Sequence, residues 1–242
     1  MKVLAINGSP SATNGRTWWV LSRFISGMEE ANAQVTTIQL AHKKIHHCTG
    51  ELACWLKTPG KCIHNDDMNE ILPLFQDADA VVFASPVYVD GMTGLLKNCI
   101  DRIVPIAEPF IELRDGHARH PKRNGGPSKV ALVSVCGFPE LDNFDPLVHH
   151  IQAISRNLNA VFAGSVLRPA APGIDAAGIF HPFKIRKVSA AIKTAGMEFV
   201  RDGKISDETA EAIATELFAI EEYREGANRE FEKALKKINN VA

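Results

Sequence analysis

The sequence predicts an α/β protein built on a doubly wound parallel sheet, and three observations predict it. Short runs of apolar and β-branched residues recur along residues 1–167, and each run is followed by a polar turn. Segments with apolar residues at helical spacing alternate with these runs, as in a parallel sheet covered by helices on both faces. The chain has 242 residues, of which 45% are hydrophobic, enough for one sizeable core with extensions.

Five short strands are expected, each ending where turn-forming residues begin, as at Asn7-Gly8 and at Ser85-Pro86. The runs are too short for helices and rich in residues that favour buried strands. The predicted strands are Val3–Ile6, Val35–Leu40, Ala80–Ala84, Val130–Val135 and Val161–Leu167.

Helices are predicted between the strands from apolar residues that recur at intervals of three and four. In the first helix these residues are Val20, Phe24 and Met28. The predicted helices are Arg16 to about Ala31, a helix opened by Asp66-Asp67, Leu95–Val104, Pro146–Leu158 and Pro182–Val200. Residues 42–65 and 105–128 show no clear period, so we expect two long loops.

Residues 1–200 are expected to form the main domain, and residues 201–242 a C-terminal helical extension. Ser206 is a suitable N-cap, and the acids after it suit a first helical turn. One long final helix is predicted, interrupted at Gly226, and it either packs on its own domain or serves as a dimerisation arm. Its apolar positions are Ile213, Leu217, Ile220, Tyr223, Ala227, Phe231, Leu235 and Ile238.

Charge and composition exclude several classes of protein. The formal net charge is −1, and the only dense basic stretch is Arg119–Arg123, which does not support a nucleic-acid partner. The apolar run Val3–Ile6 is shorter than that of a signal peptide, and no run is long enough to cross a membrane. We therefore expect a cytoplasmic protein. Its five unevenly spread cysteines do not form a disulfide framework.

The segment between the first strand and the first helix is a candidate phosphate site. It offers hydroxyl groups, an amide, a glycine and the N–H groups that open a helix. Neither the G-x-x-x-x-G-K-[ST] pattern nor the G-x-G-x-x-G pattern is present, which disfavours P-loop and dinucleotide sites. An ordinary polar turn is the alternative, since turns favour these residues anyway.

A second segment makes the first more specific. Gly8-Ser9-Pro10 is followed by Ser85-Pro86-Val87-Tyr88, then by Lys97 and by Asp101-Arg102. In this arrangement the chain closely resembles the NADPH-dependent FMN reductase and iron–sulfur flavoprotein group of flavodoxin-like proteins, over roughly residues 1–167. The resemblance implies a flavodoxin-like, five-stranded parallel sheet of order 2-1-3-4-5 and a non-covalently bound FMN.

The resemblance also implies three FMN-binding loops. The phosphate would be held by Ser9, Ser11, Asn14, Gly15, Arg16 and Thr17. The isoalloxazine ring would be wrapped by Pro86, Val87, Tyr88, Val89, Asp90, Gly91 and Met92. The third loop would follow the fourth strand at Cys136, Gly137 and Phe138. Because hydride chemistry belongs to the flavin, we assign no catalytic acid or base.

The cysteine loop departs from the pattern of iron–sulfur flavoproteins. Cys48, Cys54 and Cys62 match three of that group's four cysteines, while Glu51 occupies the second place. A [4Fe–4S] cluster normally requires four thiolates, and a carboxylate is a poor substitute. Zinc bound with a nearby histidine is a further alternative, although the spacing matches no standard zinc module. We expect a metal-free loop that lines the flavin site or a subunit contact.

Three functions from different classes remain open, two of them more strongly supported. The first is an enzyme in which NAD(P)H reduces bound FMN, which then reduces a small acceptor such as a quinone, free flavin or nitro-compound. The second is a flavodoxin-like carrier that exchanges electrons with protein partners without oxidising NAD(P)H, and a third, weaker class is an FMN-binding scaffold without turnover. The loops at 42–65 and 105–128 are expected to wall a substrate pocket, which favours the enzyme. A homo-dimer or homo-tetramer is expected, as among relatives.

Overall fold

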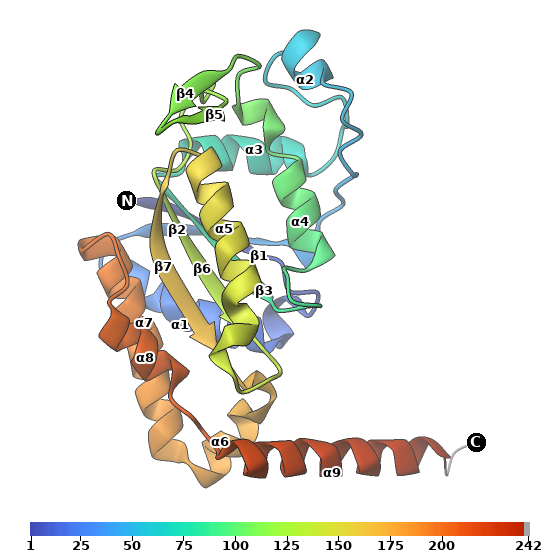
Figure 1. Ribbon diagram of the computed structural model, residues 1–242, viewed down its shortest axis with the longest axis vertical. Coiled ribbons are helices and arrows are strands. Elements are labelled where there is room, and N and C mark those ends of the chain that lie inside the picture. Colours follow the sequence, from blue (N-terminus) through green and yellow to red (C-terminus); the bar gives the residue numbers. More distant parts are fainter. Residues whose placement is uncertain (240–242) are drawn as a thin grey trace.

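The computed structural model describes residues 1–239, so residues 240–242 of the predicted extension lie outside the described residues. Five parallel strands form one sheet in the order β2-β1-β3-β6-β7. Counted along the chain, this order is 2-1-3-4-5, which confirms the predicted flavodoxin-like topology (Figure 1). The strands are β1 (Lys2–Asn7), β2 (Gln34–Gln39), β3 (Ala80–Pro86), β6 (Lys129–Val135) and β7 (Val161–Arg168).

Helices cover both faces of the sheet, and alternate residues of β1 divide between the two cores. Val3 and Ala5 pack into the core of one face, while Leu4 and Ile6 pack into the core of the other. The first face is covered by α1 (Arg16–Glu30) and α7 (Pro182–Arg201). The second is covered by α3 (Met68–Asp77), α4 (Gly94–Asp101) and α5 (Asp145–Asn157).

Two glycines allow α1 and α7 to touch backbone to backbone. A Cβ at Gly27 would lie 1.9 Å from the carbonyl oxygen of Lys193, and one at Gly196 would lie 2.2 Å from that of Phe24. Side chains at these positions would force the helices apart. The close crossing lies near the C-terminal end of α1 and fixes the position of α1 relative to α7.

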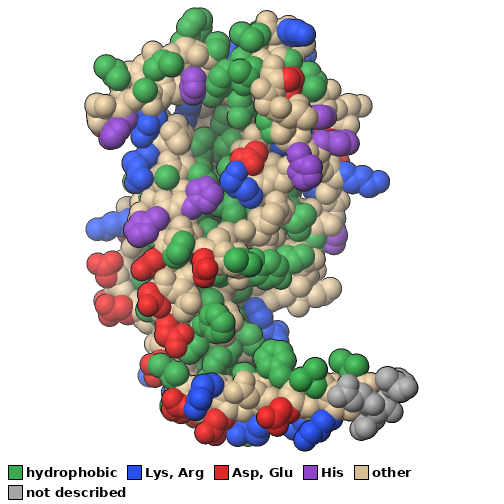
Figure 2. Space-filling view, turned by 45° about the vertical axis from the view of Figure 1, so that its right-hand side comes forward, with side chains coloured by type: hydrophobic (Ala, Val, Ile, Leu, Met, Phe, Trp, Pro, Cys, Tyr) green, Lys and Arg blue, Asp and Glu red, His purple; other side chains and the backbone are tan. Residues whose placement is uncertain are grey.

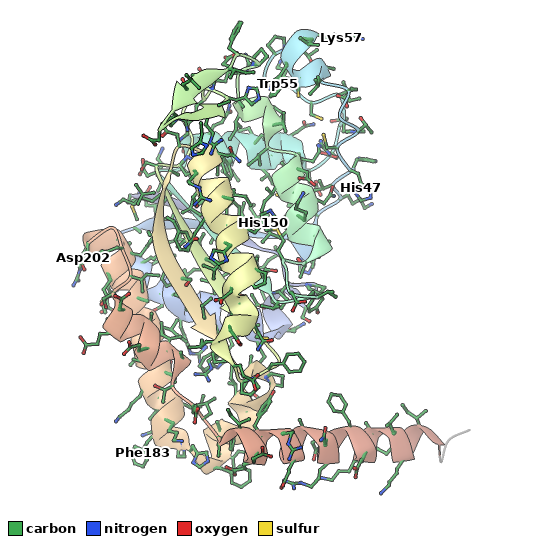
Figure 3. All side chains as sticks on the ribbon, in the orientation of Figure 1. His47, Trp55, Lys57, His150, Phe183 and Asp202 are labelled. Atoms are coloured by element: carbon green, nitrogen blue, oxygen red, sulfur yellow. The ribbon has the colours of Figure 1, made fainter. Side chains whose placement is uncertain are left out.

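The two long loops contain small elements that contact each other away from the carboxyl edge of the sheet. Residues 105–128 hold a hairpin, β4 (Glu112–Arg114) with β5 (His117–Arg119), and residues 42–65 hold α2 (Ala53–Leu56). Trp55 of α2 donates a hydrogen bond from Nε1 to the carbonyl oxygen of Val104 and packs on the ring of His120 (Figure 3). The helix predicted over 95–104 ends earlier, at Asp101.

The C-terminal segment corrects the prediction of one long final helix. It forms α8 (Asp207–Ala214) and α9 (Ile220–Asn239), with Ser206 capping α8 as predicted. The buried guanidinium of Arg168 donates to the carbonyl oxygens of Ile213 and Thr215, and these contacts end α8. The predicted interruption at Gly226 is also wrong, because α9 continues through it. A further helix that was not predicted, α6 (Ile174–Phe180), precedes α7.

Within residues 1–239, no helix combines the length and the apolar character that crossing a membrane requires.

Candidate functional site

Three loops meet at the carboxyl edge of the three central strands. Asn7 at the end of β1 pairs with Ala84 of β3, and Pro86 pairs with Val135 of β6. The loops begin in contact, since the amide of Gly8 donates to the carbonyl oxygen of Ala84 at 2.8 Å. The structure therefore brings together the three segments that contain all the predicted cofactor residues, at the edge where doubly wound sheets bind ligands.

The first loop is organised by Asn7, which the sequence reasoning did not select. Its side-chain oxygen accepts from the amide of Ser9 at 3.0 Å, and its nitrogen donates to the carbonyl oxygen of Ala12 at 3.2 Å. The hydroxyl of Ser9 in turn accepts from the amide of Ser11 at 3.4 Å. In the sequence, the signal for such a turn is an Asn directly after a predicted strand. Ser9 is buried here, whereas Ser11 and Asn14 are exposed.

The mouth of α1 is suited to an anion. Gly15 is the N-cap residue and has no side chain that could cap the first amides, which start at Arg16 and Thr17. A Cβ at Gly15 would lie 2.9 Å from the Cβ of Ser11, so only glycine fits without a shift of the loop. Uncapped amides and the positive end of the helix dipole together form a phosphate site.

The side chain of Arg16 points away from the first loop. Its guanidinium forms an ion pair with Asp175 of α6, and both side chains are partly exposed. This contact joins the first turn of α1 to a helix near the end of the chain. Arg16 therefore contributes its backbone amide to the mouth of α1 and its side chain to the packing of α6.

The second loop is a tight turn. The amide of Tyr88 donates to the carbonyl oxygen of Gly91 at 2.9 Å, and the amide of Gly91 donates back at 3.1 Å. Val89 and Asp90 at the tip have φ angles of 47° and 62°, a left-handed conformation that is costly for a β-branched residue. Val89 is 99% exposed, and such strain with an uncovered apolar side chain is typical of ligand-binding segments.

Buried Thr93 connects the second loop to the first. Its hydroxyl donates to the carbonyl oxygen of Gly8 at 2.7 Å and accepts from the amide of Leu96 at 3.3 Å, which caps α4. Its own amide donates to the hydroxyl of Ser85 at 3.0 Å. The sequence reasoning missed Thr93, although it lies two residues before the predicted helix Leu95–Val104 and threonine near a helix start is a recognised cap signal.

The third loop presents a buried thiol and an exposed ring. Cys136 is buried, burial raises the pKa of its thiol, and its Sγ accepts from the amide of Phe138 at 3.4 Å. The ring of Phe138 is exposed. Tyr223 of α9 donates from its hydroxyl to the carbonyl oxygen of Gly137 at 2.6 Å. The C-terminal extension thus contacts the site, which no local sequence signal indicated.

The two long loops do not wall this site within one chain, contrary to the prediction. The amide of Gly126 donates to Gln76 and that of Ser128 to Asp79, two residues that precede β3. The hairpin therefore lies toward the amino ends of the strands, and the cysteine loop packs beside the last turn of α4 (Figure 1). The cysteine loop likewise does not line the three-loop edge.

The cysteine loop surrounds a small cavity. The cavity has a volume of about 150 Å³. It is lined by Cys48, Gly50, Glu51, Leu52, Cys54, Cys62, Asp101, Arg102, Val104 and Pro105. Burial, and secondarily the neighbouring Cys62 and Glu51, raises the pKa of the Cys54 thiol. The residues at all four family cysteine positions therefore face one cavity.

A buried ion pair lies at the wall of this cavity. Arg102 donates to the carboxylate of Asp66 at 2.7 Å, and both side chains are almost fully buried. Burial alone would raise the pKa of Asp66, but bonds from Arg102 and from the amides of His46 and Met68 hold it well below its usual range. The pair anchors the cysteine loop to α4.

The donor set around the cavity does not fit a four-thiolate cluster. Glu51 supplies a hard carboxylate oxygen, and its pKa is lowered by a hydrogen bond from the hydroxyl of Thr49. Within residues 1–239, no three histidine, cysteine, aspartate or glutamate side chains are placed to hold a metal ion. These observations do not test whether the loop binds a metal in solution, and the metal-free loop stays a prediction.

A separate hollow of about 600 Å³ lies between α1 and the helices α6 and α7. Trp19, Arg23, Arg186 and Lys193 are among the residues that line it, and Arg23 stacks over the ring of Trp19 at 3.8 Å. It contains none of the predicted cofactor residues, so it is distinct from the three-loop edge.

Comparison with a protein-family model and with similar proteins identifies the family. The model of the family described as NADPH-dependent FMN reductase matches residues 1–126. An iron–sulfur flavoprotein of Archaeoglobus fulgidus is 37% identical over 140 residues, which are 58% of this chain and 58% of that protein. One from Methanocaldococcus jannaschii is 31% identical over 177 residues, 72% of this chain and 86% of that protein.

Solved structures show the same fold at low sequence identity. An FMN-dependent NADH-azoreductase of Bacillus anthracis superposes with a TM-score of 0.60 at 18% identity, covering 83% of this chain and 99% of that one. An NAD(P)H:quinone oxidoreductase of Methanothermobacter marburgensis gives 0.58 at 16% identity, covering 82% and 96%. With the family match over more than half of its length, the chain belongs to the NADPH-dependent FMN reductase family, whose members are flavin-dependent reductases.

Proposed function

We propose that this chain binds FMN at the three-loop edge and works as an NAD(P)H-dependent oxidoreductase. The acceptor is a small molecule such as a quinone, free flavin or nitro-compound. One observation carries the proposal: the uncapped mouth of α1 lies at the same sheet edge as a rim of exposed apolar side chains on the second and third loops. That combination suits a ligand with a phosphate at one end and a flat ring at the other.

The first and second loops have distinct roles in holding FMN. The amides of Arg16 and Thr17 receive the phosphate, with Gly15 leaving the backbone accessible. The turn at Val89 and Asp90 supplies backbone N–H donors to the polar edge of the ring system. When bound, FMN supplies the chemistry that accepts a hydride from a nicotinamide and passes electrons onward.

A titration tests the cofactor site. The purified chain, freed of ligand, is expected to quench FMN fluorescence at a one-to-one ratio. Gly15→Val places a branched side chain against Ser11 and is expected to weaken FMN binding at least about tenfold, or about 1.4 kcal/mol. Gly178→Ala is the matched control, because a Cβ there meets no atom within 4 Å. Absence of binding in the unaltered chain would refute the proposed site.

An electron carrier is the second candidate, and the open rim favours it. Val89 stands almost completely exposed, and the hairpin and cysteine loop lie away from the edge. A carrier needs an exposed flavin edge for protein partners. Stopped-flow mixing of the FMN-loaded chain with NADPH or NADH separates the two functions. Rapid loss of the flavin absorption band supports the reductase, whereas no loss within minutes supports the carrier.

A further inference from the structure

Most of α9 projects away from the body of the protein. Tyr223 near its start contacts the third loop, but Phe231, Leu235 and Ile238 further along are largely exposed. Figure 1 shows the helix extending sideways beneath the carboxyl edge of the sheet, and Figure 3 shows its outer side chains standing clear of the body. An isolated amphipathic helix of this length is marginal in water, so packing on a partner would stabilise it.

The exposed side chains are sorted by type around the helix. Figure 2 shows hydrophobic side chains along one side of the projecting helix and charged side chains along the other. The apolar stripe consists of Ile220, Tyr223, Ala227, Phe231, Leu235 and Ile238, at intervals of three and four residues. Tyr223 and Ala227 are partly buried, whereas Phe231, Leu235 and Ile238 are exposed in one chain. Exposed apolar side chains at this spacing are typical of a helix that pairs with another helix.

The stripe is symmetric about Arg229. Ala227 and Phe231 lie equally far before and after it, as do Tyr223 and Leu235. Ile220 and Ile238 complete the symmetry at the two ends. If two copies of α9 lie antiparallel with Arg229 at the midpoint, every stripe residue therefore meets a stripe residue of the other copy at the same level. Small Ala227 would then oppose large Phe231, which allows the helices to approach closely.

Charges along α9 favour the same arrangement. Glu221, Glu222 and Glu225 outnumber Arg224 in its first part, and Lys233, Lys236 and Lys237 outnumber Glu230 and Glu232 in its last part. An antiparallel pair brings the acidic part of one copy beside the basic part of the other, whereas a parallel pair sets like charges side by side. The two helix dipoles are also opposed favourably in the antiparallel pair.

The central arginine does not obstruct this pairing. Each step along an α-helix turns by about 100°, so a residue two positions from both Ala227 and Phe231 points to the opposite side. Arg229 therefore faces away from the stripe, where its guanidinium lies 3.5 Å from the carboxylate of Glu225. The two copies of Arg229 would not meet at the axis.

We propose that α9 pairs antiparallel with the α9 of a second copy of this chain, with a two-fold axis beside Arg229. The occupant of the apolar stripe is thus another copy of the same helix. A two-fold pair of this type is closed and self-complementary, so it yields a dimer and not a filament. The pairing is independent of the proposed reaction, since it rests on α9 alone.

Charge reversal tests the pairing while leaving the stripe intact. One variant carries Glu221→Lys, Glu222→Lys and Glu225→Lys, and a second carries Lys233→Glu, Lys236→Glu and Lys237→Glu. Each variant alone sets like charges side by side and is expected to sediment as a monomer at concentrations where the unaltered chain is a dimer. An equimolar mixture of the two is expected to regain the dimer mass, because opposite charges then face each other at both ends.

A single apolar change tests the stripe. Phe231→Glu is expected to reduce self-association at least tenfold, as measured by sedimentation equilibrium. Phe110→Glu is the matched control, since Phe110 is 72% exposed and Phe231 70% exposed, and Phe110 lies near the hairpin. Circular dichroism and FMN binding check that each variant is folded. A monomeric unaltered chain, unchanged association of Phe231→Glu, or a mixture that stays monomeric would each overturn the proposal.

Discussion

The hydroxyl of Thr93 donates a hydrogen bond to the carbonyl oxygen of Gly8 at 2.7 Å, and both lie at the base of the candidate site. The bond joins the start of α4 to the loop after β1, two segments that the chain separates by 85 positions. The same oxygen caps α4, so one side chain sets the spacing of two loops and the start of a helix.

Thr93→Val is therefore expected to lower the free energy of unfolding by about 2 kcal/mol, because it leaves a buried carbonyl group and a helix amide unpaired. Urea unfolding followed by circular dichroism measures the change. Thr93→Ser keeps the hydroxyl and is expected to cost well under half as much. Equal losses in the two variants would mean that the methyl group, and not the hydrogen bonds, is responsible.

The crossing of α1 and α7 predicts a strong effect of a small substitution. Gly27→Ala puts a Cβ 1.9 Å from the carbonyl oxygen of Lys193 and is expected to destabilise the protein by about 3 kcal/mol, despite the better helix propensity of alanine. Gly178→Ala in α6 meets no neighbour and is expected to be neutral or stabilising by up to about 1 kcal/mol. Thermal unfolding of the two variants, compared with the parent, tests this contrast.

The buried pair of Asp66 and Arg102 predicts a dependence of stability on acid. The pKa of Asp66 is lower in the folded than in the unfolded chain, so its contribution is complete above the unfolded value of about 3.9 and is lost as the pH falls below it. Asp66→Asn is expected to cost about 3 kcal/mol at pH 7 and to make the decline below pH 4 shallower. Parallel slopes for the two proteins in acid would contradict this role.

The cysteine cavity predicts a gain of metal binding by one substitution. Glu51→Cys completes four thiols around the cavity and is expected to hold an iron–sulfur cluster after anaerobic reconstitution with iron and sulfide. The unaltered chain is expected to retain substoichiometric iron under the same treatment. Iron analysis and visible absorption provide the readout, and Glu51→Ser is the control. Full cluster content in the unaltered chain would show that Glu51 substitutes for a thiolate after all.

The thiols also differ in their expected reactivity. Burial raises the pKa of Cys99 to about 12, and Cys136 is buried as well, whereas Cys48 is exposed. Because the thiolate is the reactive form, Cys48 is expected to be alkylated first in the native protein at pH 8, and Cys99 only after unfolding. Peptide mass spectrometry after timed alkylation gives the order. Rapid native labelling of Cys99 would indicate that α4 opens locally.

Local patterns were sufficient to predict the five strands and most of the helices, while the order of the strands was implied by the family resemblance. Strand residues such as Val3–Ile6 carry an apolar run and a turn signal within ten positions, so their structure needs no distant information. The end of α8 was not predictable in this way, because it depends on Arg168, a residue from another element that enters the core and binds its last carbonyl groups. At Gly226 the sequence predicted a break that the structure does not have. A single glycine lowers the stability of a helix but does not end it, so α9 continues through Gly226.

The candidate site likewise combines features that the local sequence indicates with contacts between distant segments that it does not indicate. The positions of the first and second loops were predictable, because turn-forming glycines, prolines and hydroxyl residues follow the predicted strands there. Their role in holding FMN was implied by the family resemblance and stays a prediction. The contacts of Arg16 with Asp175 and of Thr93 with Gly8 join segments far apart in the chain, and single residues give no sign of such partners. The prediction that residues 42–65 and 105–128 wall the pocket was wrong, because loop length and composition do not reveal at which edge of a sheet a loop lies.

The bond from Tyr223 to Gly137 spans 86 positions of the chain and has a practical consequence for shortening the protein. A truncated version that kept only the five strands and their covering helices would lose the phenol that holds the loop after β6. In such a minimal domain the third loop would lack its contact with α9. Anyone trimming this chain for crystallisation or for fusion to another protein should therefore keep at least the first turn of α9.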